Sequence, residues 1–145
     1  RAGCALDSAA AAYAQGGHGG NFALGYAADA GGGGGPSAAV CGEAPLLCQA
    51  LECLRKEAEA CHGAHLGTLV FHSLGGGTGS GLGSRLVEEL RDLYPSAALL
   101  TASVLPMAAG ENPMQAFNAV LALASVQELA DGVLLYENDR LMAGA

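Results

Sequence analysis

From residue 45 onward, apolar positions first recur at helical spacing and then form a short continuous run. The first stretch, PLLCQALECLRKEAEAC, opens on a proline suited to a first helical turn and places Glu52 four residues before Lys56. Its apolar positions at helical spacing are Leu47, Leu51, Leu54, Ala58 and Cys61. The second stretch, GTLVFHSL (67–74), is short, apolar and partly β-branched. This pattern predicts a helix followed by a strand that is buried on both faces.

A second helix is predicted over LGSRLVEELRDLY (82–94), because its apolar and charged residues separate onto two faces. The apolar face holds Leu82, Leu86, Leu90 and Leu93, and the opposite face holds Arg85, Glu88, Glu89 and Asp92. The next stretch, SAALLTASVL (96–105), predicts a strand. Strand, glycine-rich loop and helix therefore follow one another between 67 and 94.

The same order returns toward the end of the chain. A loop (106–113), a helix over MQAFNAVLALASVQEL (114–129) and a strand over GVLLY (132–136) are predicted there. The inner side of this helix is expected to hold Met114, Phe117, Leu121, Ala124 and Leu129. Alternating strands and helices predict an α/β fold, a parallel sheet with helices on both faces. Ligands of such sheets bind beyond the carboxyl ends of the strands, here 73–80, 105–111 and 136–139.

Residues 1–44 differ from the remainder because they are rich in alanine and glycine and have few large apolar side chains. The five glycines from Gly31 to Gly35, followed by Pro36, exclude a helix or central strand and predict a surface loop insertion. The sequence thus divides into an N-terminal segment (1–44) and a partial α/β domain (45–145).

Charge and cysteine content narrow the possible functions. The chain of 145 residues has 14 acidic and 6 basic side chains and a formal net charge of -8, which argues against nucleic acid and anionic membranes as partners. No apolar run has the length of a membrane span and no signal peptide opens the chain, so a soluble cytoplasmic protein is expected. The five cysteines are odd in number and form no C-x-x-C pair, which predicts neither a disulfide framework nor a zinc ribbon. The cluster Cys61, His62 and His65 lacks a fourth metal ligand, so no metal site is predicted.

The stretch HSLGGGTGSGLG (72–83) is the strongest candidate for chemistry. Glycines between a strand and a helix allow positive φ angles and a close approach of backbone N–H groups to phosphate oxygens, and Thr78 and Ser80 add hydroxyl donors. The stretch lacks the lysine of G-x-x-x-x-G-K-[ST] and fits no register of G-x-G-x-x-G. From these residues alone, a dinucleotide enzyme and a loop that only packs a helix on a strand both stay open.

Several motifs together resemble the tubulin family. GGGTGSG (75–81), after a strand that ends in HS, resembles the signature phosphate loop of that family and of its prokaryotic relatives. RKEAEAC, GSGLGSRLVEELRDLYP and YEND resemble tubulin segments in order and separation, and GGHGGNFALGY resembles an earlier phosphate-facing loop. The resemblance covers 51–141 well and implies a Rossmann-like GTPase domain of the tubulin/FtsZ type.

The resemblance implies GTP as the ligand, accompanied by Mg²⁺. It places the phosphates at Ser73, Gly76, Gly77, Thr78 and Gly79, with Gly20 and Asn21 in the earlier loop. Glu111 matches an acidic residue near the ribose, Gln115 a position where many members have Glu, and Asn138 an asparagine that recognises the guanine edge. No catalytic residue is expected within the chain, because the family takes acidic groups for hydrolysis from a neighbouring subunit.

Within the family, three features are most similar to delta tubulin, with gamma and epsilon tubulin as alternatives: the short loop from Pro106 to Asn118, Gln115 and the segment GVLLYENDRL. This similarity implies other tubulin subunits and microtubule or centriole components as partners, and a place in the cytoskeleton at centrioles and basal bodies. The chain departs from the family at Gly20, where many members have asparagine, and in its glycine-rich insertion. We expect an incomplete domain, either a GTP-binding cytoskeletal subunit or a remnant of the fold that does not bind nucleotide.

Overall fold

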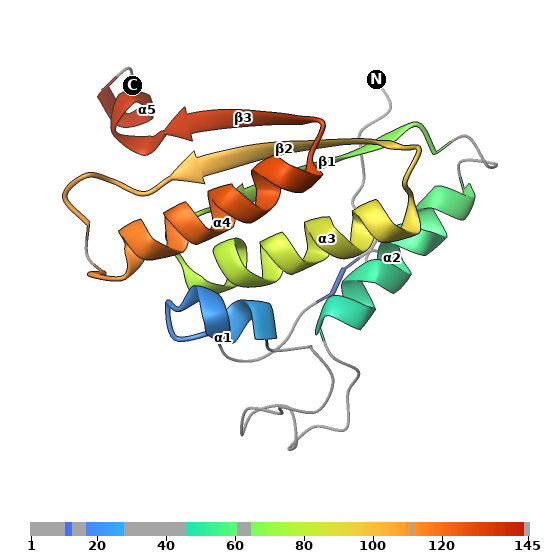
Figure 1. The fold of residues 1–145 in the computed structure, drawn as a ribbon, viewed down its shortest axis with the longest axis horizontal. Coiled ribbons are helices and arrows are strands. Elements are labelled where there is room, and N and C mark those ends of the chain that lie inside the picture. The colour runs from blue at the N-terminus through green and yellow to red at the C-terminus, as the bar shows by residue number, and fades with distance from the viewer. Residues whose placement is uncertain (1–10, 13–16, 28–45, 61–64, 111, 144–145) are drawn as a thin grey trace.

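The core of the fold is a parallel sheet. The structure is a computed structural model. It describes residues 11–12, 17–27, 46–60, 65–110 and 112–143, which are called the described residues below. The strands are β1 (Gly67–Ser73), β2 (Ala98–Leu105) and β3 (Gly132–Glu137). They pair in the order β1-β2-β3, and both pairings are parallel (Figure 1). The predicted α/β class with a parallel sheet is confirmed.

Helices connect the strands and precede them. They are α1 (Phe22–Ala27), α2 (Leu46–Ala60), the π-helical turn η2 (Thr78–Leu82), α3 (Gly83–Leu93), α4 (Gln115–Leu129) and α5 (Asn138–Ala143). The sequence pattern predicted α2, α3 and α4, whereas α1 and α5 are too short to give a periodic signal. None of the described helices combines the length and the apolar character needed to cross a membrane.

The strand register brings the carboxyl ends of the three strands to one edge of the sheet. Ser73 pairs with Val104, and Leu105 pairs with Glu137. The predicted ligand-facing segments after these strands therefore begin side by side (Figure 1). This edge carries the candidate site.

The core lies between the sheet and the helices α2, α3 and α4. One buried cluster joins α3, β2 and α4 and consists of Val87, Leu90, Leu99 and Val126. A second cluster lies close to the glycine loop and consists of Leu74, Ala119 and Ala122, with Phe22 and Leu105 packed against it. Because Phe22 belongs to α1, the second cluster also holds that short helix on the domain.

Two predictions of helix faces need correction. In α3, Leu90 is buried as expected, but Val87 is fully buried and Leu93 is exposed, so the inner face is rotated toward Val87. In α4 the predicted inner residues Phe117 and Leu121 are exposed. The buried residues of α4 are Asn118, Ala119, Ala122 and Val126. Small residues face inward in α4 because they let the helix approach η2 and the sheet closely.

The helices α2, α3 and α4 gather on one face of the sheet (Figure 1). On the other face, alternate strand residues such as Leu69, Phe71, Leu134 and Tyr136 are exposed in the described part of the chain, and Phe71 is 75% exposed. Helices on the second face therefore stay a prediction, as does the division into residues 1–44 and 45–145.

Candidate functional site

The glycine loop connects β1 to a continuous helical segment. The strand ends at Ser73, the backbone N–H of the buried Leu74 bonds the Val104 carbonyl at 2.9 Å, and η2 begins at Thr78. Gly77 has φ of -74°, and the described glycines with positive φ are Gly19 and Gly20 rather than any in this loop. The positive φ angles that glycine would allow are therefore not used in this loop.

Close packing of backbone on backbone explains the buried glycines of the loop. A Cβ on Gly77 would lie 2.8 Å from the Asn21 nitrogen, and one on Gly81 would lie 2.6 Å from the Tyr26 nitrogen. A Cβ on Gly79 would collide with the Ser73 carbonyl oxygen. These glycines let η2 lie against α1 and the end of β1. At Gly79, the space is occupied by protein backbone rather than left for a ligand.

Gly76 differs from these neighbours because it is exposed and nothing lies within 4 Å of the place where a Cβ would be. Among the described residues, the first amide of this turn with an acceptor is that of Ser80, which bonds the Gly76 carbonyl at 3.4 Å. The N–H groups of residues 76–79 have no acceptor in the described part of the chain. Unbonded amides at the start of a helix attract anions.

The three hydroxyl groups near the loop have different surroundings. Thr78 is exposed, and its Oγ1 lies 2.9 Å from Nδ1 of His18. Ser73 is also exposed, and its Oγ accepts a long bond of 3.4 Å from the Gly75 amide. Ser80 is fully buried and donates its hydroxyl to the Gly76 carbonyl. Thr78 and Ser73 can therefore face a ligand, whereas the prediction that Ser80 adds a ligand donor is wrong.

His72 fixes the π-helical turn from the sheet side. Its Nδ1 lies 2.8 Å from the Gly79 carbonyl and its Nε2 lies 2.8 Å from Oγ of Ser103. Because a carbonyl oxygen only accepts, Nδ1 carries the hydrogen, and in the neutral ring Nε2 accepts from the Ser103 hydroxyl. Residues of β1 and β2 thus hold the helical turn that presents the loop, and such π turns are frequent at functional sites.

The earlier loop, residues 17–21, lies directly against the glycine loop. Gly19 and Gly20 have φ of 57° and 64°, a conformation that glycine and asparagine adopt most readily. Oδ1 of Asn21 accepts the Ala23 amide at 2.9 Å and so caps the start of α1. The structure therefore brings Gly20 and Asn21 to the predicted site, where the Asn21 oxygen has a capping role.

Asn118 is a site residue that the sequence reasoning missed. It is 1% exposed and contacts three backbone segments that meet at the site. Its Nδ2 donates to the carbonyls of Gly20 at 2.7 Å and Gly75 at 3.0 Å, and its Oδ1 accepts the Phe22 amide at 2.9 Å. The available signal was a single asparagine inside the apolar run AFNAVLALA.

The loops after β2 and β3 complete this edge of the sheet. Nε2 of Gln115 bonds the Met107 carbonyl at 2.9 Å, and the Asp139 carboxylate accepts the Ala108 amide at 2.9 Å. Asn138 begins α5 and is partly exposed, and no hydrogen bond joins its side chain to another described residue. Glu111, the predicted ribose contact, lies outside the described residues. Gln115 and Asn138 are the first residues of α4 and α5, next to the connections that follow β2 and β3, and their contacts with a nucleotide stay a prediction.

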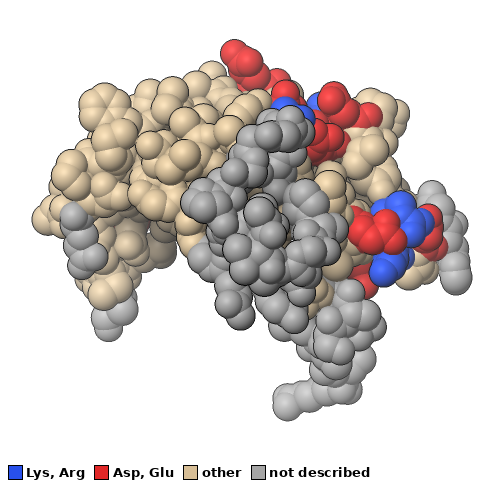
Figure 2. Space-filling view, turned by 90° about the horizontal axis from the view of Figure 1, so that it is seen from below, with Lys and Arg blue, Asp and Glu red and all other residues tan. Residues whose placement is uncertain are grey.

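The charged side chains of the protein belong to neither the glycine loop nor the earlier loop. Seen from below, they gather on the side of α2 and α3, and none is drawn on the opposite side, where α1 lies (Figure 2). Arg85, the first charged residue after the loop, is paired with Glu88 at 3.0 Å and with Glu89 at 2.5 Å. Positive potential at the loop therefore comes from unbonded amides and the helix dipole, without a free lysine or arginine among the described residues.

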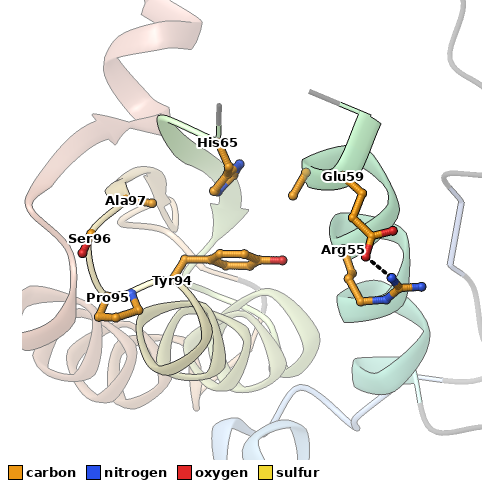
Figure 3. A pocket seen from close by; sticks show the side chains of 8 residues that line it. Arg55, Glu59, His65, Tyr94, Pro95, Ser96 and Ala97 are labelled. Atoms are coloured by element: carbon orange, nitrogen blue, oxygen red, sulfur yellow. Dashed lines mark hydrogen bonds and ion pairs between the residues drawn. The ribbon is translucent and has the colours of Figure 1, made fainter. Parts of the chain in front are cut away.

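A cavity bordered by described residues lies at the other end of the sheet. It has a volume of about 630 Å³ and lies between the end of α2 and the turn from α3 to β2. Tyr94 extends into it toward α2, beside His65 and opposite Arg55 and Glu59 (Figure 3). Arg55 is paired with Glu52 and Glu59, which raise the pKa of its guanidinium. This cavity offers no unpaired cation and lies far from the carboxyl ends of the strands.

Comparisons with known proteins match nearly the whole chain. The model of the Tubulin/FtsZ family, GTPase domain, matches residues 10–145. Similar curated proteins include the tubulin beta-1 chain of Colletotrichum graminicola and the tubulin beta-3 chain of Zea mays, each 35% identical over 130 residues. The tubulin beta-1 chain of Chondrus crispus is 37% identical over 131 residues. The matches cover 89% to 90% of this chain but 26% of the length of each relative.

Proposed function

This chain belongs to the Tubulin/FtsZ family of GTPase domains, and from that premise we propose that it binds GTP as part of a tubulin-like cytoskeletal subunit. The observation that carries the proposal is the unbonded run of amides at residues 76–79, next to the open space at Gly76. No described acidic side chain lies in the glycine loop or the earlier loop to repel a phosphate group.

The proposed contacts follow from the arrangement of the loops. The amides of 76–79 and the hydroxyls of Ser73 and Thr78 hold phosphate oxygens, and the neighbouring loop with Gly20 and Asn21 borders the same space. The Asn138 side chain, which has no described partner, recognises the guanine edge. Glu111 is the proposed ribose contact, and Gln115 is a further proposed contact of the nucleotide. A carboxamide suits guanine because it offers both a donor and an acceptor.

Magnesium is proposed to accompany the nucleotide, held mainly by phosphate oxygens and water. The described residues contain no group of three or more His, Cys, Asp or Glu side chains that could hold a metal ion by themselves. When bound, Mg²⁺ neutralises phosphate charge, and the chain contributes the amides and hydroxyls around it.

Hydrolysis and assembly belong to the same proposal. The loop supplies donors for phosphate but no described general base, so we propose that turnover needs acidic groups from a neighbouring tubulin subunit.

A finer proposal is a delta-type subunit in the cytoplasm, associated with centrioles or basal bodies. It rests on the short 106–118 loop, Gln115 and the segment GVLLYENDRL. In cells, the tagged protein would concentrate at centrioles, and an even distribution along cytoplasmic microtubules would contradict the delta assignment.

The direct test compares the binding of GTP, ATP and NAD by calorimetry in the protein and in Asn138→Ala. We expect a preference for GTP over ATP that Asn138→Ala narrows by about 1 to 3 kcal/mol, because a buried hydrogen bond to guanine is lost. Arg140→Ala is the matched control, since this side chain is 81% exposed and pairs with Glu137. Equal losses for GTP and ATP would refute the role of Asn138. A preference for NAD would indicate a dinucleotide enzyme. If the protein bound none of the three ligands, it would be a remnant of the fold.

A further inference from the structure

We infer that Asn118 is a positioning residue of the nucleotide site, which aims the Gly76 amide at a phosphate oxygen. The inference rests on the proposed binding of GTP at the glycine loop. Asn118 lies in the first turn of α4, is 1% exposed and does not reach the open space at Gly76 itself. It acts through the backbone groups that it binds.

The first step concerns the peptide unit between Gly75 and Gly76. Its carbonyl oxygen, on Gly75, accepts a bond of 3.0 Å from the buried Nδ2 of Asn118. A trans peptide unit is planar, and its C=O and N–H point in opposite directions. With the carbonyl held inward, the Gly76 N–H points outward, where Gly76 is exposed and no described group accepts its hydrogen.

The second step concerns the earlier loop. The other hydrogen of Nδ2 bonds the Gly20 carbonyl at 2.7 Å, and Oδ1 accepts the Phe22 amide at 2.9 Å. One carboxamide thereby sets the distance between the turn before α1 and the glycine loop, the two segments that border the proposed phosphate position. Two donor hydrogens and an acceptor are needed at once, a combination that an asparagine provides and an aspartate does not.

The test uses Asn118→Asp, which keeps the size and the acceptor but faces the carbonyls of Gly20 and Gly75 with an oxygen. Affinities for GTP, GDP and guanosine are measured by calorimetry, with thermal unfolding alongside. We expect the affinity for GTP and GDP to fall about tenfold to a hundredfold, which is the loss expected for one hydrogen bond to a charged group. The affinity for guanosine, which has no phosphate, should change less than about threefold. Equal losses for all three ligands would overturn the inference.

The matched control is Val126→Ala, a fully buried position two turns further along α4 that belongs to the core cluster with Val87, Leu90 and Leu99. It should lower the unfolding temperature without changing the ratio of GTP to guanosine affinity. A change in that ratio as large as in Asn118→Asp would also overturn the inference. If the unaltered protein binds guanosine but neither GTP nor GDP, the proposed phosphate site fails. If it binds GTP and only the ratio test fails, the role of Asn118 alone is refuted.

If Asn118→Asp does not fold, the unaltered protein still decides the question. In ¹⁵N-labelled protein, the chemical shift of the Gly76 amide proton should move downfield when GDP or inorganic pyrophosphate is added. When guanosine is added, it should change no more than the shifts of amides far from the loop. An unmoved Gly76 resonance at saturating GDP would overturn the inference.

Discussion

Two groups of glycines in one short region have different physical reasons to be glycine. Gly77, Gly79 and Gly81 lie against backbone atoms of the earlier loop, β1 and α1, respectively, whereas Gly76 faces open space. The first group lets η2 pack against its neighbours, and the second leaves room beside unbonded amides. A glycine-rich sequence therefore combines a packing function and a binding function, and only substitution at each position separates them.

The largest effect is expected where backbone meets backbone. Gly81→Ala places a methyl group against the Tyr26 nitrogen and the Phe22 carbonyl, so α1 must separate from η2. We expect a loss of more than about 3 kcal/mol in the free energy of unfolding, at the upper end of overpacking costs. Gly76→Ala is the control and should change the same quantity by less than about 1 kcal/mol. Denaturant unfolding measures both, and equal losses would refute the distinction between the groups.

A third kind of glycine is found in the earlier loop, where conformation matters more than space. Gly20 has φ of 64°, and the nearest atom to an added Cβ is the end of the Asn112 side chain. We expect Gly20→Ala to cost about 1 to 2 kcal/mol because an L-residue is strained at this φ. Gly20→Asn should cost less, since asparagine tolerates this conformation better. Thermal unfolding distinguishes the pair, and an equal cost would show that the Asn112 contact decides instead.

The start of α1 provides a smaller test of how firmly this helix is held. Asn21→Ala removes the cap on the Ala23 amide, and we expect a cost of about 1 kcal/mol. Asn21→Gly should cost a few tenths of a kcal/mol, as glycine does at other cap positions. If backbone packing by Gly77 and Gly81 holds α1, both costs stay well below that of Gly81→Ala. A larger loss in Asn21→Ala than in Gly81→Ala would reverse the account.

The smallest expected effect comes from a side-chain contact of the same helix. The Tyr26 hydroxyl donates to Glu88 at 2.6 Å, and this bond raises the pKa of the tyrosine. Its contribution to stability is present below the ordinary tyrosine pKa of about 10 and is lost as the pH rises through the raised value. Tyr26→Phe should lower the free energy of unfolding by about 0.5 kcal/mol at pH 8 and should weaken the fall of that free energy as the pH rises above 10. Unfolding measured between pH 8 and 11 checks this, and an unchanged alkaline dependence would contradict it.

The sequence predicted the elements of the sheet and its helices well, because β1, α3, β2, α4 and β3 have clear periodicity or apolar runs. It was less informative about helix faces. In α3, charged residues mark the outer side, so Leu90 was correctly expected inside. In α4, apolar residues occur all round the helix, so the pattern selected Phe117 although Asn118 and Ala122 face inward.

For the candidate site, the sequence located the loops but not the contacts between them. The motif predicted Gly76 and Thr78, which are exposed at the carboxyl edge of the sheet. The role of Asn118 depends on which backbone carbonyls α4 meets, and a single sequence does not contain that information. Ser80 was predicted to donate to a ligand but donates to the Gly76 carbonyl. The sequence does not decide between these partners, because a serine hydroxyl in a helix can reach either a ligand or the backbone of its own helix.

The central claim is that the unbonded amides beside Gly76 form the phosphate site, and Gly76→Val tests it most directly. The side chain would enter open space without a described neighbour, so the fold should be retained, with an unchanged circular dichroism spectrum and cooperative unfolding. Titration with GTP should then show an affinity lower by at least about tenfold. The valine side chain would occupy the place of a phosphate group and prevent the backbone amide from donating a hydrogen bond to a charged phosphate oxygen. A folded Gly76→Val variant that binds GTP as tightly as the unaltered protein would contradict the account.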